Sequence, residues 1–250
     1  MTSLLLRSFV ATCLCSYLSG CGSSPARTSN AAEGRFQYAQ ELAKNERYEE
    51  AIQEFQEVKN KHPYSRFAVE AELEIANLFF KRESFIEAQS AYEVFKSLHP
   101  QHPQTDLVTF RIGLSFFNQL PSSIDRDLSL AKKAITHFEE VTRKFPQSTY
   151  VQEAVEKRLS AQSMLVEKEF YIADFYLKKK KYKSALSRYE RVIDAPPGKL
   201  KDRALYGATV CAVLAGVQEK GKKYFAALTE EFPDSPYAKT IRDERGKYGL

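Results

Sequence analysis

The stretch that decides the fold is YEEAIQEFQEVKNKHP, residues 48–63. Within it, Ala51, Phe55 and Val58 follow one another at spacings of four and three residues, which place their side chains on one face of a helix. Pro63 marks the end of that helix, because proline has no amide hydrogen and its ring clashes with the preceding turn. The stretch therefore predicts a helix that buries a small, an aromatic and an aliphatic side chain.

The same four positions recur in five units along the chain. The intervals between the prolines are 37, 46, 51 and 36 residues, a spacing typical of helical repeats. We expect the small residue to let two helices approach closely and the aromatic residue to fill the space between neighbouring units. The small residues are Ala51, Ala88, Ala134, Ala185 and Gly221; the aromatic residues Phe55, Tyr92, Phe138, Tyr189 and Phe225; the third position Val58, Phe95, Val141, Val192 and Leu228; and the prolines Pro63, Pro100, Pro146, Pro197 and Pro233.

The pairs Tyr48-x-x-Ala51, Phe85-x-x-Ala88 and Tyr182-x-x-Ala185 resemble the start of the second helix of the tetratricopeptide repeat, a helix pair of about 34 residues. The resemblance implies an all-α fold, a right-handed solenoid of about five such helix pairs. A capping helix at about 236–247 is expected to close the stack, because terminal repeats need a polar outer face. Only ten glycines and ten prolines occur, which argues against an all-β fold.

Three further features predict local structure. Ser65, Ser148 and Ser235 each follow a repeat proline by two residues and are expected to cap the next helix. The stretch 149–181 has no glycine or proline, so it predicts either one long helix or two abutting helices. The stretch 120–129 contains Pro121 and Asp125-Arg126-Asp127 and predicts an extended loop.

The N-terminus predicts export. Residues 1–20 contain an apolar stretch too short to span a bilayer, as in a secretory signal peptide. The end of this stretch, Leu18-Ser-Gly-Cys21, resembles the lipobox of bacterial lipoproteins, which implies a lipid on Cys21; a chance cysteine after an ordinary signal peptide is the alternative. Residues 21–32 are expected to form a lipidated flexible tether and residues 33–250 a repeat domain. Gly22 and Ser23, with no aspartate after the cysteine, suggest delivery to the outer membrane.

The residues that could carry catalysis or bind a metal have simpler interpretations. Gly216–Lys222 matches GxxxxGK, but Lys223 stands where serine or threonine should meet magnesium and no strand precedes it, so a helix–helix turn is expected. The pair His99 and His102 lacks further ligands nearby and also predicts a turn. Cys211 is expected to be a buried small hydrophobe, and the three glutamate pairs are expected on exposed helix faces: Glu49-Glu50, Glu139-Glu140 and Glu230-Glu231. We therefore expect no catalytic residue, metal or cofactor.

Charge is divided unevenly between the two halves of the repeat domain. Residues 33–117 hold 10 basic and 14 acidic residues, a net charge of −4, whereas residues 178–250 hold 17 and 9, a net charge of +8. The basic half, with Lys178–Lys181 and Lys183, could face an acidic protein or anionic lipid headgroups, or could serve only for solubility.

Within this register, several strings resemble the BamD family, the lipoprotein component of the machine that assembles outer-membrane β-barrels. The strings are Leu98–Leu107 leading into Arg111–Leu114, then Asp125-Arg126-Asp127, Phe145–Tyr150 and Glu169–Tyr176. The resemblance implies a periplasm-facing scaffold held in the outer membrane by its lipid, with no nucleic acid as partner. Its N-terminal repeats would receive unfolded barrel precursors, and its C-terminal repeats would dock on the periplasmic domains of the central barrel protein, beside other assembly lipoproteins. The spacing from Lys157 to Glu169 differs by one residue from the family pattern, so no docking residue is transferred there.

Candidate binding residues follow from the repeat geometry. First helices of each pair line the concave face of such solenoids, where an extended segment can bind. On the N-terminal repeats the candidates are Tyr38, Tyr64, Asn77, Phe80 and Arg111, although ordinary packing explains the aromatic ones equally well. Two other functions remain open: a repeat lipoprotein of another envelope complex, such as pilus–secretin assembly, and an envelope enzyme acting on peptidoglycan.

Overall fold

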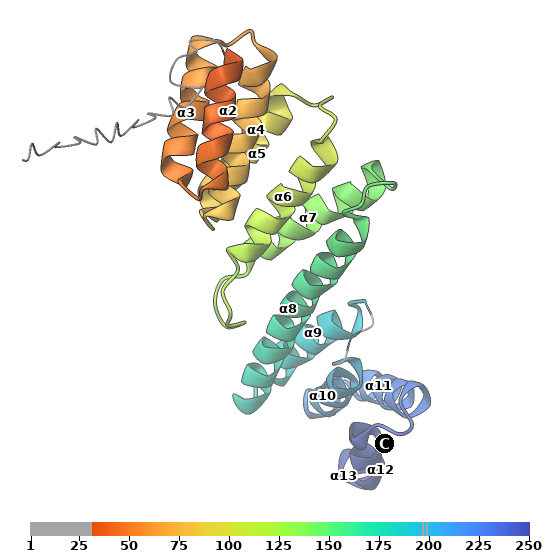
Figure 1. Ribbon diagram of the computed structural model, residues 1–250. Coiled ribbons are helices and arrows are strands. Elements are labelled where there is room, and N and C mark those ends of the chain that lie inside the picture. Colours follow the sequence, from red (N-terminus) through yellow and green to blue (C-terminus); the bar gives the residue numbers. More distant parts are fainter. Residues whose placement is uncertain (1–31, 197, 199) are drawn as a thin grey trace, which may run out of the picture. The chain divides into compact units, whose positions relative to one another are not determined.

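The computed structural model describes residues 32–196, 198 and 200–250, and this part of the chain is helical (Figure 1). Five helix pairs follow one another along the sequence and two short helices end it. The helices are α2 (Ala32–Lys44), α3 (Tyr48–Lys61), α4 (Arg66–Lys81), α5 (Phe85–Leu98), α6 (Thr105–Asn118), α7 (Ser129–Lys144), α8 (Val151–Lys178), α9 (Tyr182–Ile193), α10 (Lys201–Leu214), α11 (Gln218–Glu231), α12 (Pro236–Asp243) and α13 (Arg245–Tyr248). The predicted all-α fold of tetratricopeptide-type pairs is confirmed.

The chain forms two compact units, the first ending at Ala68 and the second beginning at Val69, within α4. In the first unit α2 and α3 pack through a buried aromatic cluster. The Phe36 ring lies 5.2 Å from Phe55 and 5.4 Å from Phe67, centroid to centroid. Ala51 and Val58 are fully buried beside them, as the repeat pattern predicts.

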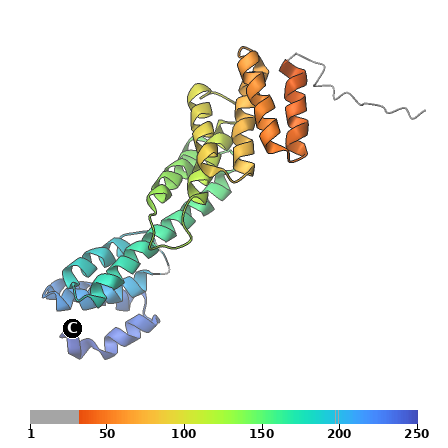
Figure 2. The same cartoon turned by 90° about the vertical axis from the view of Figure 1, so that its left-hand side faces the viewer.

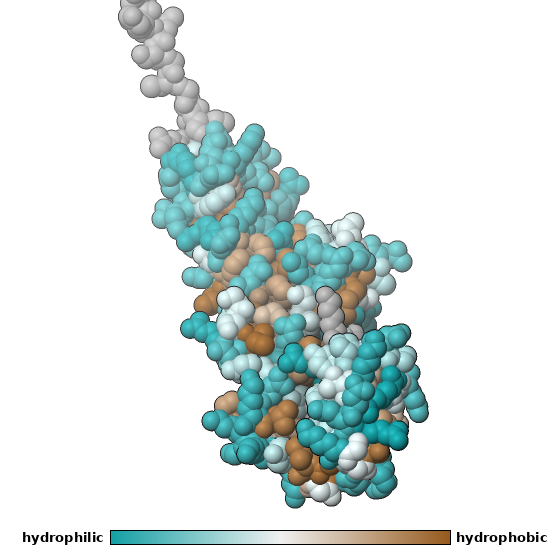
Figure 3. Space-filling view, turned by 90° about the horizontal axis from the view of Figure 1, so that it is seen from below, coloured by the Kyte–Doolittle hydropathy of each residue, from teal (hydrophilic) through white to brown (hydrophobic). Residues whose placement is uncertain are grey.

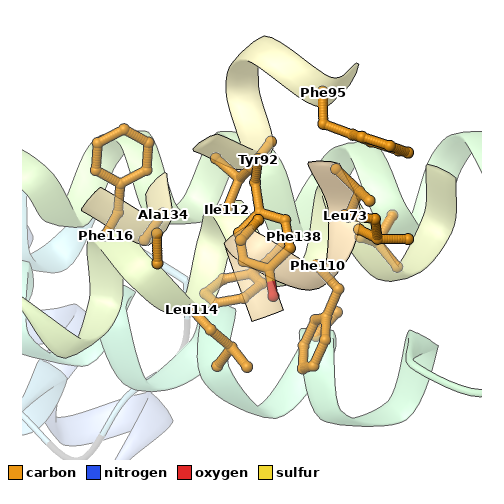
Figure 4. Close-up of a cluster of buried hydrophobic side chains, with 14 residues drawn as sticks. Leu73, Tyr92, Phe95, Phe110, Ile112, Leu114, Phe116, Ala134 and Phe138 are labelled. Atoms are coloured by element: carbon orange, nitrogen blue, oxygen red, sulfur yellow. The ribbon is translucent and has the colours of Figure 1, made fainter. Parts of the chain in front are cut away.

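The core of the second unit is built from the same repeat positions. Tyr92, Phe95, Phe138 and Val141 are buried in one cluster with side chains of α4, α6 and α8 (Figure 4). A second cluster joins α8, α9 and α10 around Tyr189, and a third joins α10 to the C-terminal helices around Leu228. The small residues also act as predicted: a Cβ added to Gly221 would lie 2.8 Å from the Val213 side chain, so only glycine permits this approach of α11 to α10. Of the repeat prolines, Pro197 lies outside the described residues.

Residues 149–181 contain one long helix, which settles the alternative that the sequence left open. Helix α8 has 28 residues, about 42 Å at 1.5 Å per residue. It packs on α7 over its first half and continues past it to lie beside α9 (Figures 1 and 2). The region between Asn118 and Ser129 is a loop, as predicted.

Other boundaries differ from the predicted ones. The expected final helix is interrupted at Glu244 and forms two helices, α12 and α13. Gly249, which follows α13, has a positive φ of 62°. Helix α2 begins at Ala32, one residue inside the expected tether, while Cys21 and the expected signal peptide lie outside the described residues.

The predicted serine caps are present in two of three cases. Ser235 caps α12 by accepting a hydrogen bond from the Tyr237 backbone amide at 3.2 Å, and the Ser65 hydroxyl accepts one from Phe67 at 3.1 Å. Ser148 was wrongly placed as the helix cap, because Tyr150 occupies that position before α8. The Ser148 hydroxyl instead organises the preceding turn by accepting a hydrogen bond from the Tyr150 amide.

Candidate peptide-binding surface

Three of the five candidate binding residues lie together in the second unit. Asn77 and Phe80 are three residues apart on α4 and therefore share a face, and Arg111 comes from α6. The Arg111 guanidinium carbon lies 4.4 Å from the centroid of the Phe80 ring, within cation–π range. The Phe85 ring, at the start of α5, lies 5.4 Å from the Phe80 ring, centroid to centroid, in a T-shaped contact. We call Asn77, Phe80, Phe85 and Arg111 the α4–α6 cluster.

Asn77 has a structural role within this cluster. The hydroxyl of the buried Tyr92 donates a hydrogen bond to Asn77 Oδ1 at 2.7 Å. Burial raises the pKa of the Tyr92 hydroxyl, so it remains a donor at physiological pH. Burial also raises the pKa of the nearby Glu74 carboxyl, although a hydrogen bond with Asn77 opposes the shift. The sequence pattern did not identify Phe85, Glu74 or the Tyr92 hydroxyl as part of this cluster. Only the Tyr92 hydroxyl left a signal, because a buried tyrosine needs a hydrogen-bond partner.

Arg111 has unused hydrogen-bonding capacity. The guanidinium is half-buried against Phe80, yet it forms no ion pair or hydrogen bond within the ranges 32–196 and 200–250. A guanidinium offers five N–H donors in a fork that fits a carboxylate or backbone carbonyls. The cluster therefore combines an apolar ring with available hydrogen-bond donors, a combination that suits binding of a peptide.

A related arrangement occurs at the other end of the second unit. The Tyr189 hydroxyl donates to Asp174 Oδ1 at 2.5 Å, and this pair has the same sequence separation, 15 residues, as Tyr92 and Asn77. Arg203 Nη2 donates to Asp174 Oδ2 at 3.0 Å and the guanidinium covers the Phe170 ring at 4.5 Å. Here the arginine is already paired with a carboxylate, whereas Arg111 is not.

The other two candidates belong to the first unit. Tyr38 is half-buried on α2, and Tyr64 is fully exposed in the turn between α3 and α4, with a relative accessibility of 102%. The structure therefore brings Asn77, Phe80 and Arg111 together and places Tyr38 and Tyr64 in a separately described part of the chain.

The histidine turn and the Asp-Arg-Asp loop are held by internal hydrogen bonds. His99 Nε2 lies 2.9 Å from Glu72 Oε2, and the rings of both His99 and His102 pack on Phe95. In the loop, Asp127 accepts hydrogen bonds from the backbone and hydroxyl of Ser129 at 3.0 and 2.8 Å. Both the histidine turn and the Asp-Arg-Asp loop therefore have structural roles in connecting helices.

Glu140 was wrongly expected on an exposed helix face. Its side chain is only 15% exposed and accepts hydrogen bonds from Lys96 at 2.7 Å and Lys144 at 2.8 Å. Burial works against ionisation, but these two ammonium groups hold the pKa of the carboxyl below its usual range. The arrangement ties α5 to α7. The other five glutamates of the three pairs are exposed.

The other residues that could have suggested catalysis or nucleotide binding also have structural roles. Cys211 is fully buried, and burial raises the pKa of its thiol to about 12, as expected for an inert cysteine. Gly216 has φ 79° in the turn between α10 and α11, so the GxxxxGK string is a helix–helix turn as predicted. Within the described residues, no group of three potential ligands could hold a metal ion, and no helix is long and apolar enough to cross a membrane.

Comparison with known proteins adds independent information. Residues 29–209 match the model of the YfiO family, described as outer membrane lipoprotein, and residues 203–235 match a tetratricopeptide repeat. The outer membrane protein assembly factor BamD of Neisseria meningitidis serogroup A is 29% identical over 213 residues, which cover 80% of this chain and 78% of that protein. BamD of Rickettsia prowazekii is 29% identical over 197 residues, covering 78% of each. The match to the solved TPR2AB domain of yeast Sti1 covers 83% of this chain and 80% of the yeast chain, at 14% identity and a TM-score of 0.44.

Proposed function

Because the chain belongs to the BamD (YfiO) family of outer membrane lipoproteins, we propose that it is a non-catalytic scaffold of the machine that assembles outer-membrane β-barrels. In this proposal the chain is anchored by lipid on Cys21 and faces the periplasm. Its N-terminal repeats bind unfolded barrel precursors, and its C-terminal repeats bind the periplasmic domains of the central barrel component, together with other assembly lipoproteins. The general role of outer membrane protein assembly factor follows from the family.

The observation that carries the precursor-binding part is the available guanidinium of Arg111 beside the Phe80 ring. An unfolded precursor offers an extended backbone, apolar side chains and a terminal carboxylate. Arg111 would take the carboxylate through paired N–H donors, and Phe80 with Phe85 would contact an apolar side chain of the peptide. Asn77 is tied to Tyr92, which holds its side chain in place on the same helix face.

The peptide test uses a synthetic segment from the C-terminus of a barrel precursor, once with a free carboxylate and once as the amide. Arg111→Gln should weaken binding of the carboxylate form about tenfold, since a hydrogen bond to a charged group contributes roughly 1.5 kcal/mol. Binding of the amide should change much less. Fluorescence anisotropy of a labelled peptide measures both. Arg143→Gln, an exposed arginine at the end of α7, is the matched control for lost charge.

A second variant tests the apolar half of the cluster. Phe80→Ala should weaken crosslinking to the same peptide while leaving helicity unchanged by circular dichroism. Unchanged crosslinking with unchanged helicity would refute the assignment of this surface, as would equal losses in the Arg111→Gln and Arg143→Gln chains.

The partner-binding part is supported by the family. The positive charge of the C-terminal half gives weaker support, because several of its cations pair internally: Arg188 pairs with Glu169 at 2.9 Å, and Lys220 pairs with Glu190 at 2.7 Å. Affinity purification of the tagged chain from its own cell envelope should recover a large barrel protein with periplasmic repeat domains. Recovery of secretin or pilus proteins without that barrel would instead favour a role in another envelope complex.

A further inference from the structure

The turn between α8 and α9 concentrates positive charge. Lys178, Lys179, Lys180, Lys181 and Lys183 are all exposed at this end of the helix pair. A cation near a helix C-terminus is favourable because of the helix dipole, but the effect is confined to the last turn and one or two cations satisfy it. The dipole therefore does not account for five lysines.

The geometry of the turn does not require lysine either. Four turns that join the helices of a pair have the same conformation, with one residue at positive φ: Glu46 at 59°, Glu83 at 60°, Lys180 at 57° and Gly216 at 79°. Two of these positions hold an acid and one holds glycine, which fits such a conformation best. The turn conformation therefore does not depend on the charge of this residue, and the five lysines need another explanation.

These lysines are also unpaired. None of the five ammonium groups forms an ion pair with a carboxylate anywhere in the described part of the chain, whereas other cations of the same unit do, such as Lys201 with Glu231 at 2.6 Å. Five like charges in six residues repel one another, and an anionic partner would relieve that repulsion. Because the side chains are exposed to solvent, the attraction should weaken with salt.

Apolar and aromatic groups lie at the same end of the helix pair. A hollow of about 370 Å³ is lined by Lys180, Lys181 and Lys183 on one side and by Leu214 and Ala215 at the end of α10 on the other. On the last turns of α8, Tyr171 and Phe175 are each 50% exposed and four residues apart, so they share a face. The Lys179 ammonium lies 5.8 Å from the Phe175 ring. Figure 3 shows how apolar side chains (brown) reach the surface in patches between hydrophilic ones (teal).

We propose that this surface, formed by Lys178–Lys183, Phe175, Tyr171 and Leu214, binds anionic phospholipid headgroups at a bilayer surface. Aromatic rings with lysines beside them are the combination found at membrane interfaces, where the ring enters the headgroup layer and the ammonium meets phosphate. An acidic protein could also neutralise the lysines and cover the rings, so it is one of the outcomes that the test must distinguish. The inference rests on membership of an outer membrane lipoprotein family and not on barrel assembly itself.

The chain contains no tryptophan, which makes a specific test possible. Phe175→Trp, in the full acylated chain, places a single fluorescent reporter at the proposed contact. The protein is reconstituted in vesicles of phosphatidylcholine alone, or of equal parts phosphatidylcholine and phosphatidylglycerol. We expect a blue-shifted emission, quenched by phosphatidylglycerol with brominated acyl chains, only in the second type of vesicle. Tyr171→Trp should behave alike.

Two controls distinguish binding by the proposed surface from attachment of the protein through its lipid anchor. Leu98→Trp places the reporter at the end of α5, where the side chain is 61% exposed, and its emission should be the same in both vesicles. Adding Lys179→Gln, Lys180→Gln and Lys181→Gln to Phe175→Trp should abolish the shift while the anchor still holds the protein on the vesicle.

The contrary outcomes are equally specific. An emission of Phe175→Trp that is identical in both vesicles, or a shift that survives the three glutamines, would overturn the proposal. A shift caused by soluble polyglutamate but not by vesicles would overturn it in favour of an acidic protein. The peptide test with Arg111→Gln addresses barrel assembly separately, so failure of one proposal does not imply failure of the other.

Discussion

Gly207 on α10 shows how a single hydrogen atom sets the distance between two helices. A Cβ built on this residue would lie 2.5 to 2.8 Å from the ring atoms of Tyr189 on α9. That ring cannot move aside easily, because it is buried and its hydroxyl is bonded to Asp174. Glycine within a helix is otherwise unfavourable by roughly 1 kcal/mol relative to alanine, so its presence here serves close packing.

We therefore expect Gly207→Ala to destabilise the chain by about 1–3 kcal/mol, the usual cost of overpacking, despite the gain in helix propensity. Chemical denaturation followed by circular dichroism measures this. Gly246→Ala on α13 is the control, since no heavy atom lies within 4 Å of its added Cβ. If Gly207→Ala proved as stable as Gly246→Ala, the packing of α9 on α10 would have to be looser than the structure has it.

At the scale of single residues, the sequence predicted which side chains are buried but not which side chains contact one another. The repeat columns identified Ala88, Tyr92 and Phe95 as core residues because helical spacing puts them on one face. Nothing in that spacing reveals that Tyr92 bonds to Asn77 or that Arg111 covers Phe80, since these contacts depend on how neighbouring helices cross. The three candidates found together were chosen for their helix face, and Phe85 was missed because it begins a second helix.

At the scale of helices, two serine turns repeat the same hydrogen-bonding pattern. The Ser148 hydroxyl donates to Asp106 Oδ2 and the Ser235 hydroxyl to Asp202 Oδ2, each at 2.6 Å. Each serine also accepts from the amide two residues on, at 3.2 Å. The turn after one helix pair is thereby tied to the start of the first helix of that pair, α6 or α10. Such a bond fixes the direction in which the next helix leaves.

Replacing Ser235 by alanine removes both bonds and leaves the Tyr237 amide and one Asp202 oxygen to water. We expect a loss of about 1 kcal/mol, as for other helix caps, and faster amide exchange confined to α12 and α13. Hydrogen exchange read by mass spectrometry locates the effect. Ser187→Ala, exposed on α9, should change neither quantity. Faster exchange spread evenly over the chain would contradict a local capping role.

Ser65 and Ser235 correctly marked the start of the next helix, whereas Ser148 did not, because α8 begins three residues after it. The single helix α8 could not be distinguished from two, because the absence of glycine and proline permits both. The break at Glu244 had no proline to announce it. Gln218 donates hydrogen bonds to the carbonyls of Tyr248 and Gly249, and these contacts, which the sequence pattern could not reveal, hold α13 against the start of α11.

Across the molecule, packing is local along the chain. Each core cluster of the second unit draws on helices adjacent in sequence, and the cluster around Leu205, Val210 and Leu228 is closed only by α12 and α13. Stability in such repeats is approximately a sum of nearest-neighbour interactions. A destabilising substitution in the C-terminal helices should therefore leave the α4–α6 cluster intact, although these helices and the cluster belong to one unit.

Ile241→Asp tests this separation. Ile241 is fully buried on α12, and an unpaired carboxylate there costs several kcal/mol, so α12 should detach from α10 and α11. Amide exchange should then rise in α10–α13 but stay unchanged in α4–α6, and the carboxylate peptide should bind as tightly as to the unaltered chain. Thr240→Asp, exposed on the same helix, adds the same single negative charge and is the control. Should exchange in α4–α6 rise as much as in α10–α11, the second unit would unfold as one cooperative body, and precursor binding could then respond directly to whatever occupies the C-terminal helices.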